Sequence, residues 1–467
     1  MQRMNALDAS FLDVEDSVSH MHIGSIGIFD GPPPGREEAA EWVLGKLPLV
    51  PRYRQTIRRL PLGVGRPVWA DDEHFNLDYH LRRTALPAPG GEEELRRLVG
   101  RIMSQQLDRD KPLWEMWLVE GSGDGRWALI SKIHHALVDG VAGSDLLSVL
   151  LDPDPEAQAP PPPPWRPEHG PGSLALLGAA LAGNLMIPIR VGAAALGAPR
   201  RMLGRVYETG QGLRGYGSTF APSASSLNGP LGPHRRWTFA RASLERIRQV
   251  RSVHGGTVND VVLACIAGGF RDLLLARGEG VERPVRTLVP VSARAEEQHG
   301  ELNNRVTAMF ADLPVEIADP VARLDAVRRQ MTELKGSHEP EAGEALVALA
   351  DVATPPLLLS LGERLATRVP QSAVNTVTTN VPGPRVPLYA CGRRMVEAFP
   401  YVPLGAHLTI GVAIFSYSGA CTFGITGDFD LASDIDVLAH GIETSLEDLL
   451  ARTPRERGAA QAVRRSA

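Results

Sequence analysis

A run of five prolines at residues 160–164 divides this sequence into two unequal parts. Proline lacks a backbone N–H and fixes its φ angle, so the run can belong neither to a helix nor to the interior of a sheet, and we expect an extended spacer on the surface. The chain has 467 residues, which is more than a single hydrophobic core usually organises. The sequence therefore predicts two domains, each of about 150 to 250 residues, joined by a connector.

The proline run lies inside a longer connector, which we place at residues 153–234. An N-terminal domain is predicted over residues 1–152 and a C-terminal domain over residues 235–453. The tail at residues 454–467 contains four arginines and is predicted to be disordered. Both domains mix strands and helices without a tight strand–helix–strand repeat, which predicts a mixed α/β fold class.

Local signals predict the elements of both domains. In the N-terminal domain they indicate strands at residues 21–29 and 127–133 and helices at residues 92–107 and 142–151. In the C-terminal domain, Ser243 is expected to cap a helix over residues 244–252 and Thr257 to begin one over residues 258–277. The further elements expected there are strands at residues 286–290, 305–313, 373–379, 407–417 and 422–427 and helices at residues 320–335 and 433–450.

Residues 173–199 are apolar and rich in small side chains, but Asn184, Pro188 and Arg190 interrupt them. A membrane-spanning helix needs about 20 consecutive apolar residues. We therefore interpret the segment as a buried or bridging helix or, alternatively, as a helix that lies in a lipid interface.

Charge and cysteine content narrow the classes of function. The 49 Lys and Arg residues nearly balance the 54 Asp and Glu residues, and no long basic run is present, so a nucleic-acid partner is not expected. The three cysteines, Cys265, Cys391 and Cys421, are far apart, which indicates neither a disulfide framework nor a thiolate metal site and fits a reducing cytoplasm. The acidic N-terminus does not resemble a signal peptide, so export by that route is not expected.

Two short motifs carry little weight. Residues 210–215 match the GxGxxG pattern, but glycines and prolines follow and no acidic residue appears before Glu245, so a dinucleotide site is not expected. His20 and His22 have the spacing of a metal-binding pair, but no carboxylate or thiol cluster accompanies them, and we interpret them as a surface or core pair. Phosphate-binding loops of the GxxxxGK[ST] type and GxSxG elbows are absent from the sequence.

The strongest motif is a pair of adjacent histidines, His134 and His135, three residues before an Asp-Gly pair. It lies where a predicted strand ends and a predicted helix begins, a corner at which a side chain can be held rigidly beside a cleft. Because neighbouring side chains on a strand point to opposite faces, one histidine should react and the other should support it. Near neutral pH, histidine can take a proton from a hydroxyl group and return it.

The Asp-Gly pair of this motif has its own expected roles. Asp139 stands in the first turn of the following helix, where it can accept backbone amide hydrogens and a buried arginine. Gly140 allows close approach of a substrate or of backbone. A zinc site made of His134, His135 and Asp139 is disfavoured, since adjacent histidines diverge and no further ligand motif is present.

With its HHxxxDG motif the chain resembles the chloramphenicol acetyltransferase-like superfamily of CoA-dependent acyltransferases. Within that superfamily it is similar to the bacterial wax ester synthase/acyl-CoA:diacylglycerol acyltransferase family. The resemblance runs in order from about residue 5 to about residue 450. The stretches that carry it are residues 7–12, 107–114, 228–236, 259–264, 289–294 and 380–384.

This resemblance implies two similar α/β domains, each a mixed sheet flanked by helices, with a long crossover and an active site in a channel between them. It implies that His135 is the general base and that Asp139 is a structural partner, with Arg294 as the expected salt-bridge partner of Asp139. The residues expected to bind substrate are Pro112, Leu113, Trp114, Asn259, Asp260, Thr378, Thr379 and Asn380, of which Asn259 and the last three are candidates for stabilising the oxyanion.

The implied function is transfer of a long-chain acyl group from acyl-CoA to diacylglycerol or a fatty alcohol, which makes triacylglycerol or a wax ester. No acyl-enzyme, metal or cofactor is expected, because no activated Ser or Cys accompanies the histidines and acyl-CoA is itself a substrate. Two alternatives stay open: a sister acyltransferase with a carrier-protein donor or another acceptor, and a noncatalytic lipid-binding protein. The expected location is the cytoplasm, peripherally at the inner membrane or at lipid droplets.

Overall fold

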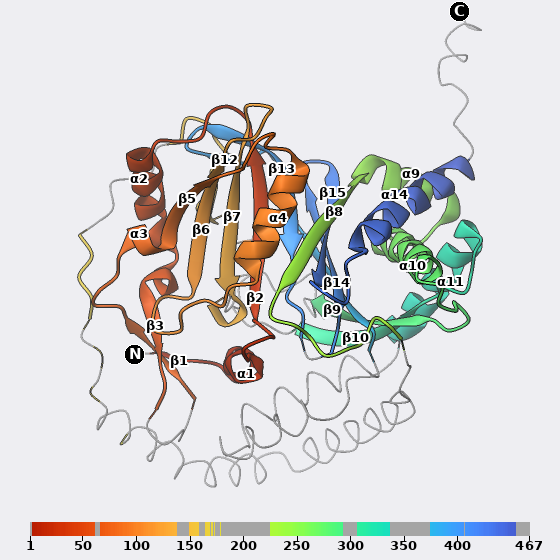
Figure 1. Ribbon diagram of the computed structural model, residues 1–467, viewed down its shortest axis with the longest axis horizontal. Helices are drawn as coiled ribbons and strands as arrows, with labels where there is room; N and C mark the ends of the chain where they lie inside the picture. Colours follow the sequence, from red (N-terminus) through yellow and green to blue (C-terminus); the bar gives the residue numbers. More distant parts are fainter. Residues whose placement is uncertain are drawn as a thin grey trace, which may run out of the picture.

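Two six-stranded sheets with helices packed on them form the body of the protein in the computed structural model (Figure 1). The structure describes residues 2–60, 66–137, 149–157, 164–168, 225–292, 306–336, 374–405 and 407–453, together with residues 170, 172 and 178. The expected mixed α/β class with two sheet-based units is confirmed.

The first sheet is antiparallel except for its last pair of strands. In spatial order it contains β12 (Tyr389–Ala390), β13 (Arg393–Tyr401), β2 (His22–Phe29), β7 (Trp127–His134), β6 (Trp114–Glu120) and β5 (Leu81–Ala85). β5 runs parallel to β6, whereas β2 and β7 are antiparallel, in a register that sets His22 opposite His134. The same half of the chain forms a small sheet of β1 (Gln2–Arg3), β4 (Val68–Asp71) and β3 (Gln55–Arg58).

β12 and β13 come from the C-terminal part of the chain but lie in the first sheet (Figure 1, blue strands beside the red β2). We expected residues 235–453 to form one C-terminal domain, and residues 389–401 depart from that expectation. β13 pairs with β2 along residues 24–29. Because β7 occupies only one edge of β2, β13 supplies hydrogen-bond partners for the backbone groups of the other edge.

Aromatic side chains fill the core on one face of the first sheet. The Trp114 ring, on β6, stacks on His80 with 4.5 Å between centroids and on Tyr53 with 4.7 Å. Its indole N–H donates to the backbone oxygen of Tyr53 over 2.8 Å, which satisfies the polar group of a fully buried ring. Helices α1 (Ala6–Val14) and α2 (Arg36–Lys46) contribute Leu12 and Trp42 to this core.

The opposite face of the first sheet packs on helix α4 (Glu92–Met103). Ala128 and Ile130 of β7 join Leu98 of α4 in this second cluster, as the alternation of strand side chains requires. The helix predicted over residues 92–107 is therefore present, but it ends at Met103. At that end, Lys132 of β7 donates to the carbonyl oxygens of Ile102 and Gln105.

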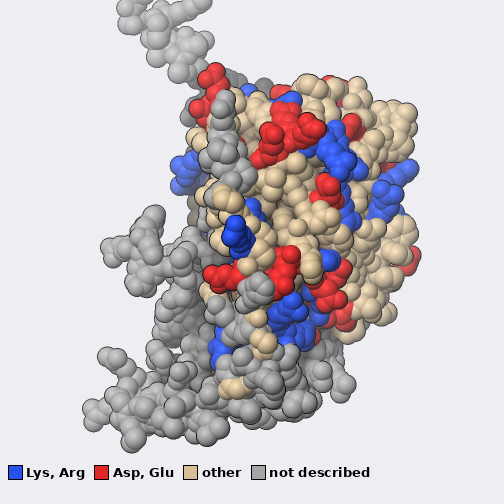
Figure 2. All heavy atoms as spheres, turned by 90° about the vertical axis from the view of Figure 1, so that its left-hand side faces the viewer, with Lys and Arg blue, Asp and Glu red and all other residues tan. Residues whose placement is uncertain are grey.

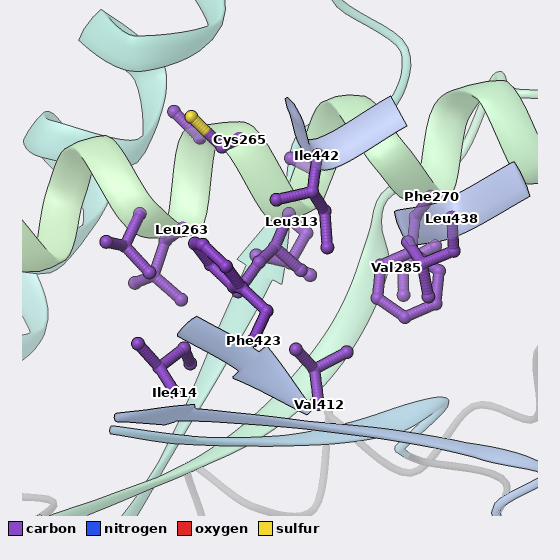
Figure 3. Close-up of a cluster of buried hydrophobic side chains, with 14 of the residues drawn as sticks. Leu263, Cys265, Phe270, Val285, Leu313, Val412, Ile414, Phe423, Leu438 and Ile442 are labelled. Atoms are coloured by element: carbon purple, nitrogen blue, oxygen red, sulfur yellow. The ribbon is translucent and has the colours of Figure 1, made fainter. Parts of the chain in front are cut away.

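The second sheet carries helices on one face. Its strands, in spatial order, are β10 (Val306–Leu313), β9 (Val285–Ser292), β11 (Thr376–Pro382), β14 (Ile410–Tyr417), β15 (Ala420–Asp428) and β8 (Arg235–Ser243). Figure 3 shows Val412 of β14 and Phe423 of β15 within one buried cluster with Phe270 and Leu438. The helices are α9 (Leu244–His254), α10 (Val258–Ala276), α11 (Pro320–Gly336) and α14 (Ile435–Ala451).

Helices α9 and α10 begin where their capping residues predict. The Ser243 side chain accepts the N–H of Arg246 and caps α9, and Gly255 ends that helix with a left-handed φ of 78°. At α10, the Thr257 hydroxyl accepts the N–H of Asp260, and the carboxylate of Asp260 accepts the N–H of Thr257 over 2.7 Å. This reciprocal pair satisfies two helix N–H groups that would otherwise lack partners.

The two sheets meet along β13. The Thr422 hydroxyl of β15 donates to the backbone oxygen of Ala398 over 2.6 Å, and the Trp237 indole of β8 donates to that of Pro400 over 3.3 Å. Toward the solvent, Arg241 of β8 pairs with a carboxylate from α4 at 2.7 Å and one from β13 at 2.6 Å. The halves are thus joined by direct contacts as well as by the connector.

Most other predicted elements are present with shifted ends. The strands expected at residues 373–379 and 407–417 are β11 and β14, and the helices expected at residues 320–335 and 433–450 are α11 and α14. The strands β12 and β13 and the helix α2 had no counterpart among the predictions. Most of the predicted helix at 142–151, residues 173–199 except residue 178, and the tail at 454–467 lie outside the described residues.

Candidate active site

The two adjacent histidines lie at the corner where β7 ends. His134 is the last residue of the strand, and His135 opens the 3-10 turn η4 (His135–Leu137). Two backbone hydrogen bonds fix the corner: the His134 N–H donates to the oxygen of Leu113 over 3.0 Å, and the His135 N–H donates to that of Met21 over 2.8 Å. The corner is thereby held between the segments that enter β6 and β2.

His134 is fully buried beside a carboxylate. Its Nε2 atom lies 3.4 Å from Oε2 of Glu15, the residue at the C-terminal end of α1. Its Nδ1 atom accepts the N–H of Ala136 over 3.1 Å, so the ring hydrogen belongs on Nε2, the nitrogen nearer Glu15. Both ring nitrogens of His134 therefore face protein groups.

Glu15 is held as a buried carboxylate. The Arg109 Nε donates to its Oε2 over 2.9 Å, and the backbone N–H of Met21 donates to its Oε1 over 3.2 Å. Burial alone would raise the pKa of Glu15, but His134 and Arg109 together outweigh burial and lower the pKa from 4.5 to about 2. The carboxylate is therefore ionised throughout the neutral pH range.

His135 has different surroundings from its neighbour. The residue is partly exposed, and its ring stacks on Phe11 of α1 with 3.8 Å between centroids. Its Nδ1 atom has no hydrogen-bond partner among the described residues. Burial, with a smaller effect of His134, lowers the pKa of His135 from 6.5 to about 4. The imidazole is therefore neutral at pH 7 and keeps a nitrogen that can accept a proton.

Pro112, Leu113 and Trp114 lie directly behind this corner. All three are buried, and neither Leu113 nor Trp114 has measurable exposed surface. Leu113 reaches the histidine pair through its carbonyl oxygen, which accepts the His134 N–H. The structure thus brings these residues to the histidines through the backbone, and their contact with substrate stays a prediction.

Two further buried side chains tie β2 and β7 to α4. The Lys132 ammonium donates to the oxygen of Ile102 over 3.0 Å, and burial lowers the pKa of Lys132 to about 8. The His22 Nε2 shares a 2.8 Å hydrogen bond with the oxygen of Met103, and burial lowers the pKa of His22 well below 6.5. His20 is also buried, so the two histidines that precede and open β2 form a core pair.

The remaining predicted residues come from α10 and β11. The Asn380 amide donates to the side-chain oxygen of Asn259 over 3.0 Å, which brings these two amides together. Asp260 and Thr378 are buried, with their side chains engaged by Thr257 and Thr287 respectively. Thr379, between Thr378 and Asn380, is partly exposed.

Val381, which follows Asn380 on β11, packs against a large buried cluster. Ala136 and Leu137 of η4 belong to the same cluster. The core of the first sheet therefore includes contributions from both β11 and the turn that His135 opens.

Three of the predicted residues, Asp139, Gly140 and Arg294, lie outside the described residues, so the ion pair between Asp139 and Arg294 stays a prediction. Within the ranges that the structure describes, no group of three or more His, Cys, Asp or Glu is placed to hold a metal ion. No helix in those ranges is both long and apolar enough to cross a membrane.

Three residues that surround the histidines received no role in the sequence analysis: Phe11, Glu15 and Arg109. Glu15 lies nearly 120 positions before His134 in the chain, and no spacing rule joins an acid to a histidine over that distance. Phe11 and Arg109 do fall inside stretches that resembled the acyltransferase family, at residues 7–12 and 107–114. The resemblance to the acyltransferase family was therefore the sequence signal that could have identified Phe11 and Arg109.

Comparison with known proteins places the chain in a family. The wax ester synthase/diacylglycerol acyltransferase catalytic domain matches residues 4–262, and the C-terminal domain of the same family matches residues 302–450. The chain belongs to this family. It is therefore an acyltransferase, and the resemblance found in the sequence is confirmed.

Curated members of the wax ester synthase/diacylglycerol acyltransferase family match along nearly their whole length. A Mycobacterium tuberculosis protein named "Probable diacyglycerol O-acyltransferase tgs1" is 35% identical over 481 residues, which cover 99% of this chain and 100% of that protein. A second protein of the same organism, "Probable diacyglycerol O-acyltransferase tgs2", is 32% identical over 461 residues, which cover 96% of this chain and 99% of that protein.

Solved structures support the same assignment of fold. The wax ester synthase/diacylglycerol acyltransferase from Marinobacter aquaeolei VT8 superposes with a TM-score of 0.69 at 25% identity, covering 97% of this chain and 100% of that one. A trichothecene 15-O-acetyltransferase from Fusarium sporotrichioides has a TM-score of 0.62 at 10% identity, covering 96% and 95% of the two chains. The latter likeness is one of fold alone.

Proposed function

We propose that His135 is the general base in the transfer of an acyl group from acyl-CoA to the hydroxyl of diacylglycerol or a fatty alcohol. His135 takes the hydroxyl proton while the oxygen attacks the thioester carbonyl carbon. A C–O bond forms, the C–S bond breaks, and the proton passes to the departing sulfur. The products are an ester and free CoA, so the step consumes no oxidant, reductant or cofactor.

The contrast between the two histidines carries this assignment. His134 is fully buried, with Nε2 3.4 Å from an oxygen of Glu15 and Nδ1 accepting the N–H of Ala136, whereas His135 is partly exposed. A pKa of about 4 keeps the His135 imidazole neutral at pH 7, as a general base must be. Stacking on Phe11 fixes the plane of the ring.

Glu15 and Arg109 act in this proposal as positioning residues. Glu15 is near His134 and bonded to Arg109 and to the N–H of Met21, and the oxygen of Met21 in turn accepts the N–H of His135. The carboxylate is therefore connected to both histidines: to His134 through its ring and to His135 through the backbone of Met21. This network restricts the movement of the corner before the substrate arrives.

Asn259 is the favoured candidate for stabilising the oxyanion. Its side-chain oxygen accepts the Asn380 amide, which orients its own NH₂ group away from that contact and leaves it as a donor. The Thr378 hydroxyl is buried and already bonded to Thr287, so it is disfavoured. Loss of one oxyanion donor typically lowers kcat by about 10²- to 10³-fold.

Both acceptor classes fit the same chemistry, because diacylglycerol and fatty alcohols each present a free hydroxyl. The curated relatives are named for diacylglycerol, and the Marinobacter protein is named for both wax ester synthesis and diacylglycerol acylation. These names support either alcohol as the acceptor. Acyl-CoA as the donor follows from the resemblance of the sequence to CoA-dependent acyltransferases. The names also weigh against a noncatalytic lipid-binding role.

The acceptors dissolve in lipid rather than in water, so the enzyme should bind membranes or lipid droplets peripherally from the cytoplasm. Residues 173–199, which apart from residue 178 lie outside the described residues, are the segment whose sequence fits an interfacial contact. Flotation of the intact chain with vesicles, before and after high salt and carbonate, tests this. Resistance to carbonate would contradict a peripheral association.

The central experiment offers purified protein a labelled long-chain acyl-CoA together with diacylglycerol and a fatty alcohol. Labelled triacylglycerol or wax ester is expected, and the His135→Ala variant should make neither. The same acyl group on a carrier protein serves as the competing donor. Transfer from the carrier protein alone would overturn the assignment of acyl-CoA as donor.

A further inference from the structure

A cavity of about 420 Å³ lies between α4, the start of β8 and the start of α14. It is lined by residues of the first sheet's helix on one side and by residues of the second sheet and its helix on the other. None of the predicted catalytic or substrate-binding residues lines it. The cavity is therefore a feature that the proposed mechanism does not use.

The lining of this cavity is strongly basic. Its acidic side chains among the described residues are Glu93 and Asp436, against five arginines: Arg96, Arg97, Arg101, Arg235 and Arg236. On the face shown in Figure 2, by comparison, acidic and basic side chains are interspersed. The excess of arginines in the lining favours an anionic ligand.

Two of the five arginines form no ion pair in the described part of the chain. Arg97 pairs with Glu93 at 2.9 Å, Arg96 lies 3.5 Å from Asp436, and Arg235 is buried. Arg101, in contrast, is exposed and forms no ion pair in the described part of the chain. Arg236 forms none there either, and it donates through Nε to the backbone oxygen of Phe429. Its two terminal nitrogens remain available.

The first turn of α14 adds backbone donors to the same cavity. Ser433 and Ile435, on either side of the N-cap residue Asp434, line the cavity. The Asp434 side chain pairs with Arg277 at 2.6 Å and does not cap the helix. The N-terminus of this 17-residue helix therefore offers uncapped N–H groups beside the arginines. Planar guanidinium groups and helix N–H groups together are the donors that recognise phosphate oxygens.

One wall of the cavity is shared with the histidine strands. Gly100, Ser104 and Gln105 line the cavity from the end of α4. The backbone oxygens of Met103 and Gln105 in the same turn hold His22 and Lys132, which belong to β2 and β7. The last turn of α4 therefore separates the basic cavity from the strand that ends at His134.

The opposite rim is apolar and exposed. Phe429 lines the cavity and is 43% exposed, and the Arg236 guanidinium lies 4.2 Å from the centroid of its ring. Leu431, two residues later, is 42% exposed. Such a rim suits either a nucleotide base, which stacks on an aromatic ring, or the acyl-chain boundary of a membrane.

We propose that this cavity is a binding site for an organic phosphate group, which Arg101, Arg236 and the N-terminus of α14 hold. The phosphate is carried by the nucleotide end of the acyl-CoA donor or by the headgroup of an anionic phospholipid. The proposal rests on the proposed function. In that function acyl-CoA is the donor and the acceptor lies in a lipid surface, and the cavity would bind a phosphate group of one or the other.

The test uses the full-length chain and measures binding, so that it does not depend on turnover. Coenzyme A and pantetheine, which lacks the nucleotide, are titrated calorimetrically into the wild type and into Arg101→Glu and Arg236→Gln. Vesicles of phosphatidylcholine, with and without phosphatidylglycerol, are co-sedimented with the same proteins. Arg248→Glu is the matched control, since Arg248 is an exposed helix arginine without an ion pair in the described ranges and does not line the cavity. Circular dichroism confirms that each variant is folded.

Loss of about tenfold or more in coenzyme A affinity in both cavity variants, with pantetheine binding unchanged, supports the nucleotide end as the ligand. Loss of sedimentation with phosphatidylglycerol vesicles alone supports the lipid headgroup. The proposal is overturned if both cavity variants bind coenzyme A and anionic vesicles as Arg248→Glu does. An enzyme that binds these ligands through the cavity but transfers no acyl group would instead contradict the proposed function.

Discussion

The Nε2 atom of His134 lies 3.4 Å from the Oε2 atom of Glu15, and neither side chain exposes more than 1% of its surface. A buried carboxylate beside an imidazole orients the ring through the hydrogen on the facing nitrogen. The residue that follows in the chain is His135, whose backbone N–H is held by Met21. We therefore infer that the first histidine of the motif anchors the second.

Replacing Glu15 with alanine should weaken both stability and catalysis. The variant leaves His134 without its carboxylate and Arg109 without its main acceptor. Breaking such a pair should cost about 2 to 3 kcal/mol, below the usual range for a fully buried pair because the Arg109 side chain is 34% exposed. Urea unfolding and the turnover number would be measured together. Asp13→Ala is the matched control, since Asp13 belongs to the same helix but is exposed, and a Glu15 variant that behaves like it would disprove the anchoring role.

His135→Ala and His134→Ala should fail in different ways. Removing the general base should lower the turnover number by at least about 10²-fold with little change in melting temperature. Removing His134 should lower the melting temperature, since the residue is fully buried beside Glu15, yet it should leave measurable activity. Thermal unfolding and initial rates with acyl-CoA separate the two effects. If His134→Ala were folded and inactive while His135→Ala stayed active, the roles of the two histidines would be reversed.

The acid limb of the pH–rate profile should lie well below the ordinary pKa of histidine. His135 must be neutral to accept a proton, and its pKa is about 4 because of burial. The value of kcat/KM should therefore stay nearly constant as the pH falls through 6.5 and decline only as it nears the lowered pKa. Circular dichroism at each pH distinguishes protonation from unfolding. An acid limb near pH 6.5 in a folded enzyme would show that His135 is exposed to solvent in the working state.

Stability itself should decrease between neutral pH and about pH 4. Burial lowers the pKa of both His80 and His135 from 6.5 to about 4. In the window between these values the unfolded chain binds protons that the folded protein does not, so the free energy of unfolding falls as the pH falls. Urea midpoints across this window measure the slope. His74, which is exposed, provides the control position. His74→Gln should leave the slope unchanged, whereas His80→Gln should reduce it.

Asn259→Ala should lower kcat by about 10²- to 10³-fold with a smaller change in KM, as loss of an oxyanion donor does. The residue is partly exposed, and in the described ranges its side chain has one hydrogen-bond partner, Asn380, so the fold should tolerate the change. Asn380→Ala removes the orienting amide and should have a weaker effect. Steady-state kinetics with acyl-CoA compare the two. An Asn259 variant with normal kcat and raised KM would indicate a role in substrate binding only.

Elements whose signals are local could be predicted from the sequence. Ser243 and Thr257 mark helix starts because the capping hydrogen bonds join residues three apart. The strand β7 was predicted for the same reason, since its apolar residues and the turn before it are contiguous. The corner that presents His135 followed from the end of that strand.

What the sequence could not predict depends on contacts between distant residues. The partner of β13, β2, lies more than 360 positions earlier, so no local pattern identifies the pairing. Glu15 and Arg109 form their hydrogen bond because the end of α1 lies beside the segment before β6. The basic cavity likewise requires α4, β8 and α14 to come together, although each arginine looks like an ordinary surface residue along the chain.

The pairing of β13 with β2 has a consequence for synthesis of the protein. While the chain emerges from the ribosome, β2 can pair with β7 early, but its other edge stays open until residues 393–401 have been made. That edge belongs to an apolar strand containing Ile26 and Phe29, both fully buried in the finished fold. Open edges of this kind template association with other chains. A nascent or truncated chain that stops before β13 should therefore depend on chaperones, and a fragment ending at residue 152 should aggregate rather than fold as an independent unit.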